Sequence, residues 1–219
     1  MLPGAGYHAE YREMLNNIGE FNKQLKEYSG DYIPLIFRPF HEHIGRWFWW
    51  GKGHATREEF ISLWQFTVNY LRDSLDVHNF IYAYSPDTVA NKEQYLEWYP
   101  GDEYVDLLGI DIYRDVKANN PRKYIHRLEL VADIANEKGK PWALTETGYS
   151  FHEDTAWWTN FLLKCINHSE LTRSMSYFML WANYRKDMYF SIYPGHPSQD
   201  NFLEFSSHSL VKFAPGKDL

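Results

Sequence analysis

The feature of this 219-residue chain that most constrains its fold is a series of short apolar runs separated by segments of helical periodicity. Each run is nearly continuous, a pattern typical of strands that are buried on both faces of a parallel sheet. Helices between such strands form the crossover connections and cover the sheet. The sequence therefore predicts an α/β protein with five parallel strands. They are expected at residues 32–38, 80–84, 105–111, 142–145 and 176–181.

Helix-boundary signals place the segments between these strands. Apolar residues at helical spacing predict a first helix over residues 7–28. Thr56 and Glu59 fit a capping box at the start of a helix that runs to about residue 73. Further helices are expected at 92–98, 121–138 and 154–168, with Gly139 ending the second of these. The tail after residue 181 is expected to be irregular.

Two glutamates, Glu42 and Glu146, each close an apolar run and precede a glycine-bearing turn. A carboxylate at the end of a buried strand is seldom there for packing, because an unpaired buried charge is costly. Active sites of α/β barrels also lie at the carboxyl ends of the strands. With tryptophans close by in sequence, the pair favours the two-carboxylate chemistry that breaks glycosidic bonds. Helix capping or a surface ion pair is the alternative interpretation.

Composition excludes several classes of function. A net charge of −7 argues against nucleic acid as the main partner. No apolar stretch is long enough to span a bilayer, so no membrane partner is expected. The aromatic fraction of 18%, with nine Trp and seventeen Tyr, suits sugar rings but also serves cores and protein interfaces. The lone cysteine, Cys165, is expected to be a buried structural thiol.

Eight sequence blocks carry a resemblance to a known family. They are FRPFHE (37–42), GRWFWWG (45–51), YSP (84–86), YPGD (99–102), GIDIY (109–113), LTETG (144–148), WAN (181–183) and PGHP (194–197). In this order, and spread over nearly the whole chain, they resemble glycoside hydrolase family 26, whose best-known members are β-mannanases. Each block by itself is weak evidence, whereas the set is highly specific.

The resemblance implies a (β/α)8 barrel of the TIM type, of which this chain would hold only strands four to eight. Residues 1–219 would then be a partial glycoside hydrolase catalytic domain, the C-terminal part of the barrel, truncated at its N-terminus. Five strands cannot close an eight-stranded barrel, and two sheet edges are left open. We therefore expect the chain by itself to be poorly stable, weakly active, or self-associated through those edges.

The resemblance also assigns roles to side chains. It implies that Glu42 is the acid/base and Glu146 the nucleophile of a retaining glycosidase, whose two carboxyls lie about 5–5.5 Å apart. Glu42 then needs a raised pKa, and apolar neighbours such as Trp47 and the charge of Glu146 are its expected causes. The residues expected to contact substrate are His41, Trp47, Asp111, Tyr113, Trp181, Tyr84 and Asn183. Ordinary structural roles stay open for His41, Asp111 and Tyr113. No metal or organic cofactor is expected.

Three details refine this assignment. Tyr113 occupies the position where the family places a tyrosine bonded to the nucleophile, so its hydroxyl is expected to orient Glu146. The His-Glu-His run at 41–43 is not a zinc motif, because neighbouring residues of a strand point to opposite faces and the helical spacing is absent. Ala182 replaces an arginine that is common in the family, which places a distal mannose-binding site in doubt.

The resulting hypothesis is a retaining endo-β-1,4-mannanase that acts on mannan, glucomannan or galactomannan by double displacement. A same-family β-1,3-xylanase or mixed-linkage glucanase is the nearest alternative. A non-catalytic glycan-binding remnant of the barrel is an alternative from another class. The polymeric substrate implies that the full-length parent acts outside the cell or in the periplasm.

Overall fold

The computed structural model describes residues 1–26, 30–150, 154–184 and 188–213. At its centre is a parallel sheet in which each strand pairs with its neighbours in the chain, in the order β1-β2-β3-β4-β5. The strands are β1 (Leu35–Phe37), β2 (Phe80–Tyr84), β3 (Leu107–Ile112), β4 (Trp142–Thr147) and β5 (Phe178–Leu180). All five expected strands are found. The outer two are shorter than expected, and β4 extends two residues further, to Thr147.

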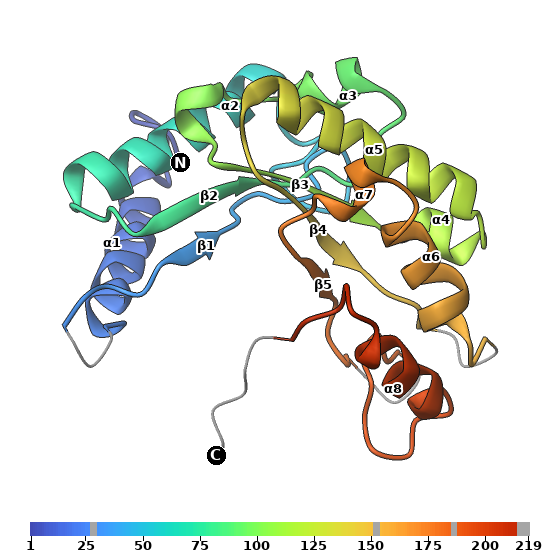
Figure 1. Ribbon diagram of the computed structural model, residues 1–219. Helices are drawn as coiled ribbons and strands as arrows, with labels where there is room; N and C mark the ends of the chain where they lie inside the picture. Colours follow the sequence, from blue (N-terminus) through green and yellow to red (C-terminus); the bar gives the residue numbers. More distant parts are fainter. Residues whose placement is uncertain (27–29, 151–153, 185–187, 214–219) are drawn as a thin grey trace.

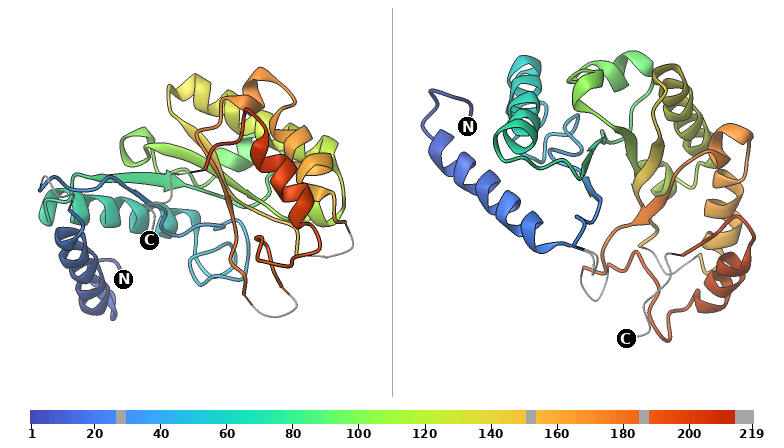
Figure 2. Two further views of the ribbon diagram at one scale, coloured as in Figure 1. Left: turned by 60° about the horizontal axis from the view of Figure 1, so that its bottom comes forward. Right: turned by 60° about the vertical axis from the view of Figure 1, so that its left-hand side comes forward.

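The helices lie in an arc outside the strands (Figures 1 and 2). In chain order they are α1 (His8–Gln24), α2 (Arg57–Asn69) with its π-helical continuation η1 (Tyr70–Ser74), α3 (Lys92–Leu96), the 3-10 turn η2 (Asp102–Tyr104), α4 (Arg114–Lys117), α5 (Pro121–Lys138), the π-helical η3 (Trp158–Leu163) with α6 (Lys164–Ile166), α7 (Glu170–Arg173) and α8 (Gln199–Ser207). Five parallel strands with helices on their outer side form half of a (β/α)8 TIM barrel.

Helix boundaries match the sequence signals where a cap specifies them. The capping box of Thr56 and Glu59 is formed, and Gly139 ends α5 in the left-handed conformation with a φ of 63°. By contrast, α1 ends at Gln24 rather than at residue 28, and residues 27–29 lie outside the described parts of the chain. The helix expected from residue 154 begins only near Trp157.

The tail after residue 181 is not irregular throughout, because α8 lies within it. This helix buries Phe205, whose ring centroid lies 5.6 Å from that of Trp158 and 5.9 Å from that of Phe178. The helix is short, so packing against η3 and β5 rather than local propensity stabilises it. The prediction of an irregular tail was wrong for that reason.

The main core lies between the sheet and the surrounding helices, and β3 and β4 are buried along their whole length. Cys165 belongs to this core as a free, buried thiol, as expected. A smaller apolar cluster, Ala83, Leu107 and Ala143, occupies the inner face of the sheet. Of the helices that the structure describes, none combines the length and the apolar character needed to cross a bilayer.

The two edge strands are the least buried part of the sheet. Within the described residues, β1 pairs only with β2 and β5 only with β4. Their central side chains, Ile36 and Met179, are 46% and 43% exposed. Ile36 is in register with Ile81, which packs on the inner cluster, so the inner face of the half-barrel is apolar and partly exposed at its edge. Self-association through these edges stays a prediction.

Candidate active site

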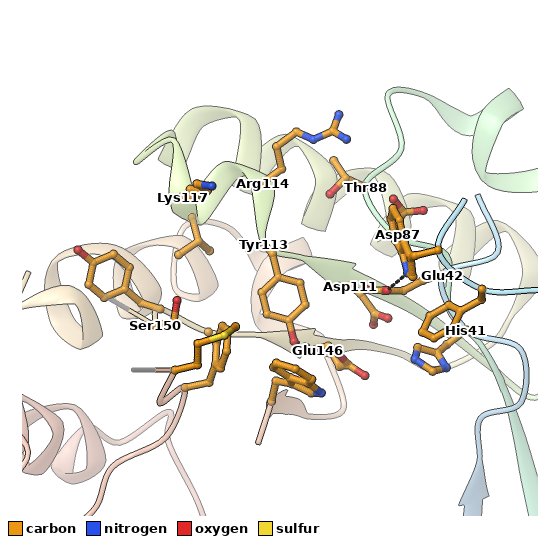
Figure 3. Close-up of a pocket in the computed structure, with 18 residues that line it drawn as sticks. His41, Glu42, Asp87, Thr88, Asp111, Tyr113, Arg114, Lys117, Glu146 and Ser150 are labelled. Carbon is orange, nitrogen blue, oxygen red and sulfur yellow. Dashed lines mark hydrogen bonds between the residues drawn. The ribbon is translucent and has the colours of Figure 1, made fainter. Parts of the chain in front are cut away.

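A cavity of about 730 Å³ opens at the carboxyl ends of the strands (Figure 3). Its size is in the range of pockets that bind small ligands. Segments that follow all five strands contribute to its wall. Among the lining residues are His41 and Glu42 after β1, Asp87 and Thr88 after β2, Asp111 and Tyr113 of β3 and its end, Glu146 and Gly148 of β4 and its end, and Trp181 after β5.

Glu42 reaches this cavity from a turn and not from a strand. β1 ends at Phe37, and the following turn holds Phe40 and Glu42 at φ values of 48° and 53°. Left-handed backbone at such residues costs energy and persists only where the surroundings impose it. Here the Glu42 amide donates to the carbonyl of Ser85, at 2.8 Å, which ties the turn to the end of β2.

The turn overturns the alternation argument for residues 41–43. His41 and Glu42 both line the cavity, whereas a strand would have sent them to opposite faces. His43 is fully buried, and its Nε2 is 2.9 Å from the hydroxyl of Tyr84. The argument against a zinc motif at residues 41–43 therefore depends only on the absence of the helical spacing.

A change of register between β3 and β4 directs Glu146 into the cavity. Leu144 pairs with Ile110, but the next pair is Glu146 with Asp111, so Thr145 is an extra residue on β4. Without this bulge, Glu146 would not pair with Asp111, and its side chain would point toward the helices. Gly109 leaves room for the bulge, since a Cβ there would lie 2.5 Å from the Thr145 side chain.

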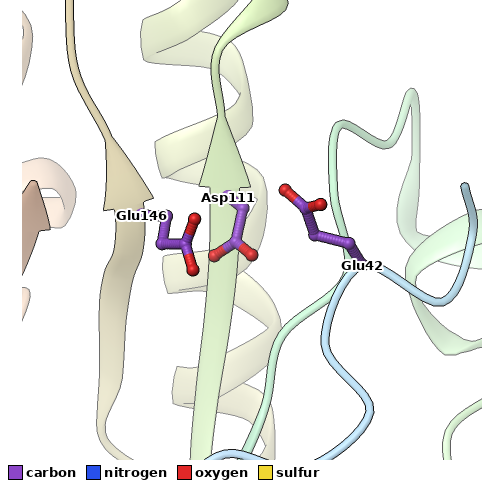
Figure 4. A group of neighbouring side chains, drawn as sticks. All are labelled: Glu42, Asp111 and Glu146. Carbon is purple, nitrogen blue, oxygen red and sulfur yellow. The ribbon is translucent and has the colours of Figure 1, made fainter. Parts of the chain in front are cut away.

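The two glutamates converge, together with Asp111 (Figure 4). One carboxylate oxygen from each of Glu42, Asp111 and Glu146 lies within 4.8 Å of the others. This is the geometry that the sequence analysis expected for Glu42 and Glu146. Three carboxylates so close together repel one another unless some are protonated or paired with a cation.

Arg38 is the cation of this group, and the sequence analysis did not assign it a role. Its Nη1 donates to Asp111 Oδ2 at 2.9 Å, and its Nη2 bonds Glu146 Oε1. The sequence signal for such a role is a charged side chain directly after an apolar run.

Asp111 is held by further donors. Ser85 and Thr145 donate their hydroxyls to Asp111 Oδ1, at 2.9 and 2.7 Å. Both Asp111 oxygens are therefore engaged within the protein, since Arg38 bonds the other. These bonds favour a role for Asp111 in holding Arg38 and the Thr145 bulge in place over a direct contact with substrate.

Glu146 is also held at both oxygens. Arg38 bonds one, and the Tyr113 hydroxyl donates to the other at 2.9 Å. Burial first, and then the charge of Glu146, raise the pKa of Tyr113, so its hydroxyl stays protonated and continues to donate. The hydrogen bond predicted between Tyr113 and Glu146 is thus present.

Glu42 has the electrostatics of a proton donor. Burial raises the pKa of its carboxyl from 4.5 to about 7, and the charge of Glu146 adds to the rise. Trp47 acts in the opposite direction to the one expected, because its indole N–H donates to Glu42 Oε2 at 2.8 Å and lowers this pKa. Gly45 allows this contact, since a Cβ there would lie 2.3 Å from the Trp47 ring.

His41 and Trp181 complete the wall on either side of the carboxylates. Burial, and then the charge of Arg38, lower the pKa of His41, so its ring is neutral at pH 7. Its centroid lies 4.9 Å from that of Phe48. Trp181 is half-buried and meets Phe190 edge to face, with the two centroids 5.1 Å apart. Both side chains line the cavity, and the substrate contacts expected of them stay predictions.

Two of the expected substrate contacts lie elsewhere. Tyr84 is fully buried in the core, and its hydroxyl donates to the carbonyl of Tyr95 at 2.9 Å. It cannot reach a ligand in the cavity, because Tyr84, the last residue of β2, points into the main core between the sheet and the helices. Asn183 is exposed and outside the cavity lining, and its amide oxygen accepts from the Ser191 backbone at 3.0 Å.

The three carboxylates are also the group that could hold a cation within the described residues. Oxygen ligands of this kind suit magnesium or calcium. Arg38 already lies between Asp111 and Glu146, however, and supplies a positive charge at bonding distance. The donor set therefore fits a carboxylate pair balanced by arginine better than it fits a metal centre.

Comparisons with known proteins agree on one family. The model of glycosyl hydrolase family 26 matches residues 2–198. A mannan endo-1,4-beta-mannosidase of Bifidobacterium adolescentis is 40% identical over 201 residues, which are 84% of this chain and 20% of that protein.

Solved structures give the same result. GH26C from Muricauda sp. MAR_2010_75 superposes with a TM-score of 0.89 at 40% identity, over 96% of this chain and 58% of that one. A GH26 beta-mannanase from Bacteroides ovatus, BoMan26A, gives a TM-score of 0.89 at 36% identity, over 97% of this chain and 61% of that one. The chain thus spans about three fifths of these structures and a fifth of the curated relative.

Proposed function

The chain belongs to glycosyl hydrolase family 26, and from this premise we propose that it is a partial catalytic domain of a retaining endo-β-1,4-mannanase. The observation that carries the proposal is the approach of Glu42 and Glu146 to within 4.8 Å, oxygen to oxygen. Retaining glycosidases need carboxyls about 5–5.5 Å apart, whereas inverting enzymes leave about 6.5–9.5 Å for a water molecule. The names of the relatives support mannan as the substrate.

In the first step, Glu146 is the nucleophile. One of its oxygens attacks the anomeric carbon, and the bond from that carbon to the leaving oxygen breaks. The leaving oxygen keeps the bonding electrons and takes the proton of Glu42. Arg38 and Tyr113 support this role, because both bond Glu146 and fix the direction of its oxygens.

In the second step, Glu42 is a base. Its carboxylate takes a proton from water, the water oxygen bonds the anomeric carbon, and Glu146 leaves as a carboxylate. A pKa of about 7 suits both steps, since Glu42 has to give a proton and take one near neutral pH. Two displacements at the same carbon return the sugar to its original β configuration.

The other groups of the cavity would bind the sugar. We propose that the ring faces of Trp47 and Trp181 stack on pyranose C–H bonds and that neutral His41 bonds a hydroxyl. Because mannan is a polymer, we propose that the parent protein acts outside the cell or in the periplasm.

The test is hydrolysis of β-1,4-mannan, β-1,3-xylan and lichenan in separate reactions, with the anomers formed from a mannan oligosaccharide followed by NMR. We expect products from mannan, the β-anomer first, and loss of hydrolysis in Glu146→Ala with mannan still bound. Products from xylan or lichenan alone would exclude the mannanase. An α-anomer as first product would exclude double displacement. Retention of mannan by the wild-type chain without any hydrolysis would favour the glycan-binding alternative.

A further inference from the structure

Asp87 is a carboxylate on the cavity wall that the proposed chemistry does not use. It follows β2, next to the turn that carries Glu42 (Figure 3). Its Oδ1 is buried and has no hydrogen-bond partner from another described residue, and only the Asp87 backbone amide bonds this carboxyl. Buried polar oxygens nearly always have a donor, from the protein or from something bound to it. An exception on the wall of a ligand-sized cavity points to a ligand as that donor.

The position of Asp87 indicates which part of a ligand it faces. Figure 3 shows Asp87, Thr88 and Arg114 on one side of Asp111, with Glu146 on the other. The sugar that is attacked has to lie over Glu146. The proton donor touches the oxygen that leaves, so groups beside Glu42 and away from Glu146 are within reach of the departing sugar.

The chemistry of this wall suits sugar hydroxyls. A carboxylate accepts from hydroxyls and a guanidinium donates to them, and neighbouring hydroxyls of one sugar can use both at once. The Arg114 side chain is exposed, and the described residues give it no hydrogen bond or ion pair. The hydroxyl of Thr88 adds a group that can donate or accept.

We propose that Asp87, together with Arg114, binds hydroxyls of the sugar on the leaving-group side of the scissile bond. This inference rests on the proposed glycosidase function and adds the residues that select a sugar, rather than another alcohol, as the leaving group. Burial raises the pKa of Asp87 to about 6, so the carboxylate is ionised at pH 7 and accepts hydrogen bonds from hydroxyls.

The experiment measures the hydrolysis of two substrates by the wild type and by two variants. Mannotetraose has a sugar leaving group, whereas phenyl β-mannobioside has a leaving group that needs a proton but carries no hydroxyls. Asp87→Ala is expected to lower kcat/KM for mannotetraose about tenfold or more and to leave that for the phenyl substrate within about twofold. Asp133→Ala, which removes an exposed carboxylate of α5, is the control and is expected to change neither.

The two substrates distinguish sugar binding by Asp87 from an effect of Asp87 on the acid, Glu42. If Asp87 acted only through the charge of Glu42, both substrates would react more slowly, and the inference would be wrong. Equal rates in variant and wild type would also overturn it. Should Asp87→Ala fail to fold, Asp87→Asn keeps the shape and is expected to lose severalfold on mannotetraose alone.

Failure of the proposed function is detected separately. If the wild-type chain hydrolyses neither substrate, the glycosidase proposal fails, and calorimetric titration with mannobiose then tests Asp87 alone. An increase in Kd of about tenfold in Asp87→Ala relative to wild type supports the binding role. The same Kd in both proteins, or no binding by the wild type, refutes it.

Discussion

Replacing Glu42 by glutamine should stabilise the fold at alkaline pH and leave it almost unchanged at acid pH. In the folded protein this carboxyl keeps its proton up to a pKa of about 7, whereas in the unfolded chain it loses it near 4.5. The folded state therefore binds the proton more tightly. Stability is greatest below pH 4.5 and falls as pH rises to 7, because Glu42 then has to ionise in a buried site.

The size of the effect follows from these two values. A pKa moved from 4.5 to about 7 corresponds to about 3 kcal/mol, at about 1.4 kcal/mol per pH unit. Glu42 is partly exposed, and screening by solvent reduces this to about 2 kcal/mol. Glutamine has nearly the same shape and no charge, so Glu42→Gln should recover most of that difference at pH 8.

Urea unfolding at pH 4.5 and pH 8 measures the effect as a free energy of unfolding. We expect Glu42→Gln to be more stable than wild type by about 2 kcal/mol at pH 8 and by less than about 0.5 kcal/mol at pH 4.5. Glu103→Gln, at an exposed glutamate, is the control and should differ little from wild type at either pH. Equal stability of Glu42→Gln and wild type at pH 8 would refute the burial argument and, with it, the reason for the raised pKa.

Three further substitutions test the contacts around the carboxylates. Tyr113→Phe removes the hydrogen bond to Glu146 and should lower kcat on mannan about tenfold with little change in stability, measured by initial rates and urea unfolding. Arg38→Met leaves two carboxylates without their cation and should lower the free energy of unfolding at pH 7 by about 3–5 kcal/mol. A change under about 1 kcal/mol, roughly that of a surface pair, would show that Arg38 does not form buried ion pairs with these carboxylates. Gly45→Ala forces the Trp47 ring off the acid, so the upper limb of the pH–rate profile should move to higher pH; an unchanged limb would show that the indole does not tune it.

Local sequence patterns were sufficient for most of the secondary structure. The apolar runs predicted all five strands, and caps such as the Thr56 capping box and Gly139 placed helix ends to the residue. These features depend on interactions among neighbours in the chain, which a sequence displays directly. The helix α8 was not predicted, because its stability comes from contacts with elements that are distant in the chain.

The residue types at the strand ends are visible in the chain alone, and they place both glutamates near one edge of a parallel sheet. How the two side chains face each other depends on the folded structure. The Thr145 bulge depends on the register between β3 and β4, and the left-handed turn at Glu42 and the bridging position of Arg38 depend on bonds to residues distant in the chain. Register is set by packing across the sheet, and a shift of one residue sends every side chain to the opposite face. Adjacent side chains point to opposite faces, so Tyr84 enters the core while its neighbour Ser85 bonds Asp111 in the site.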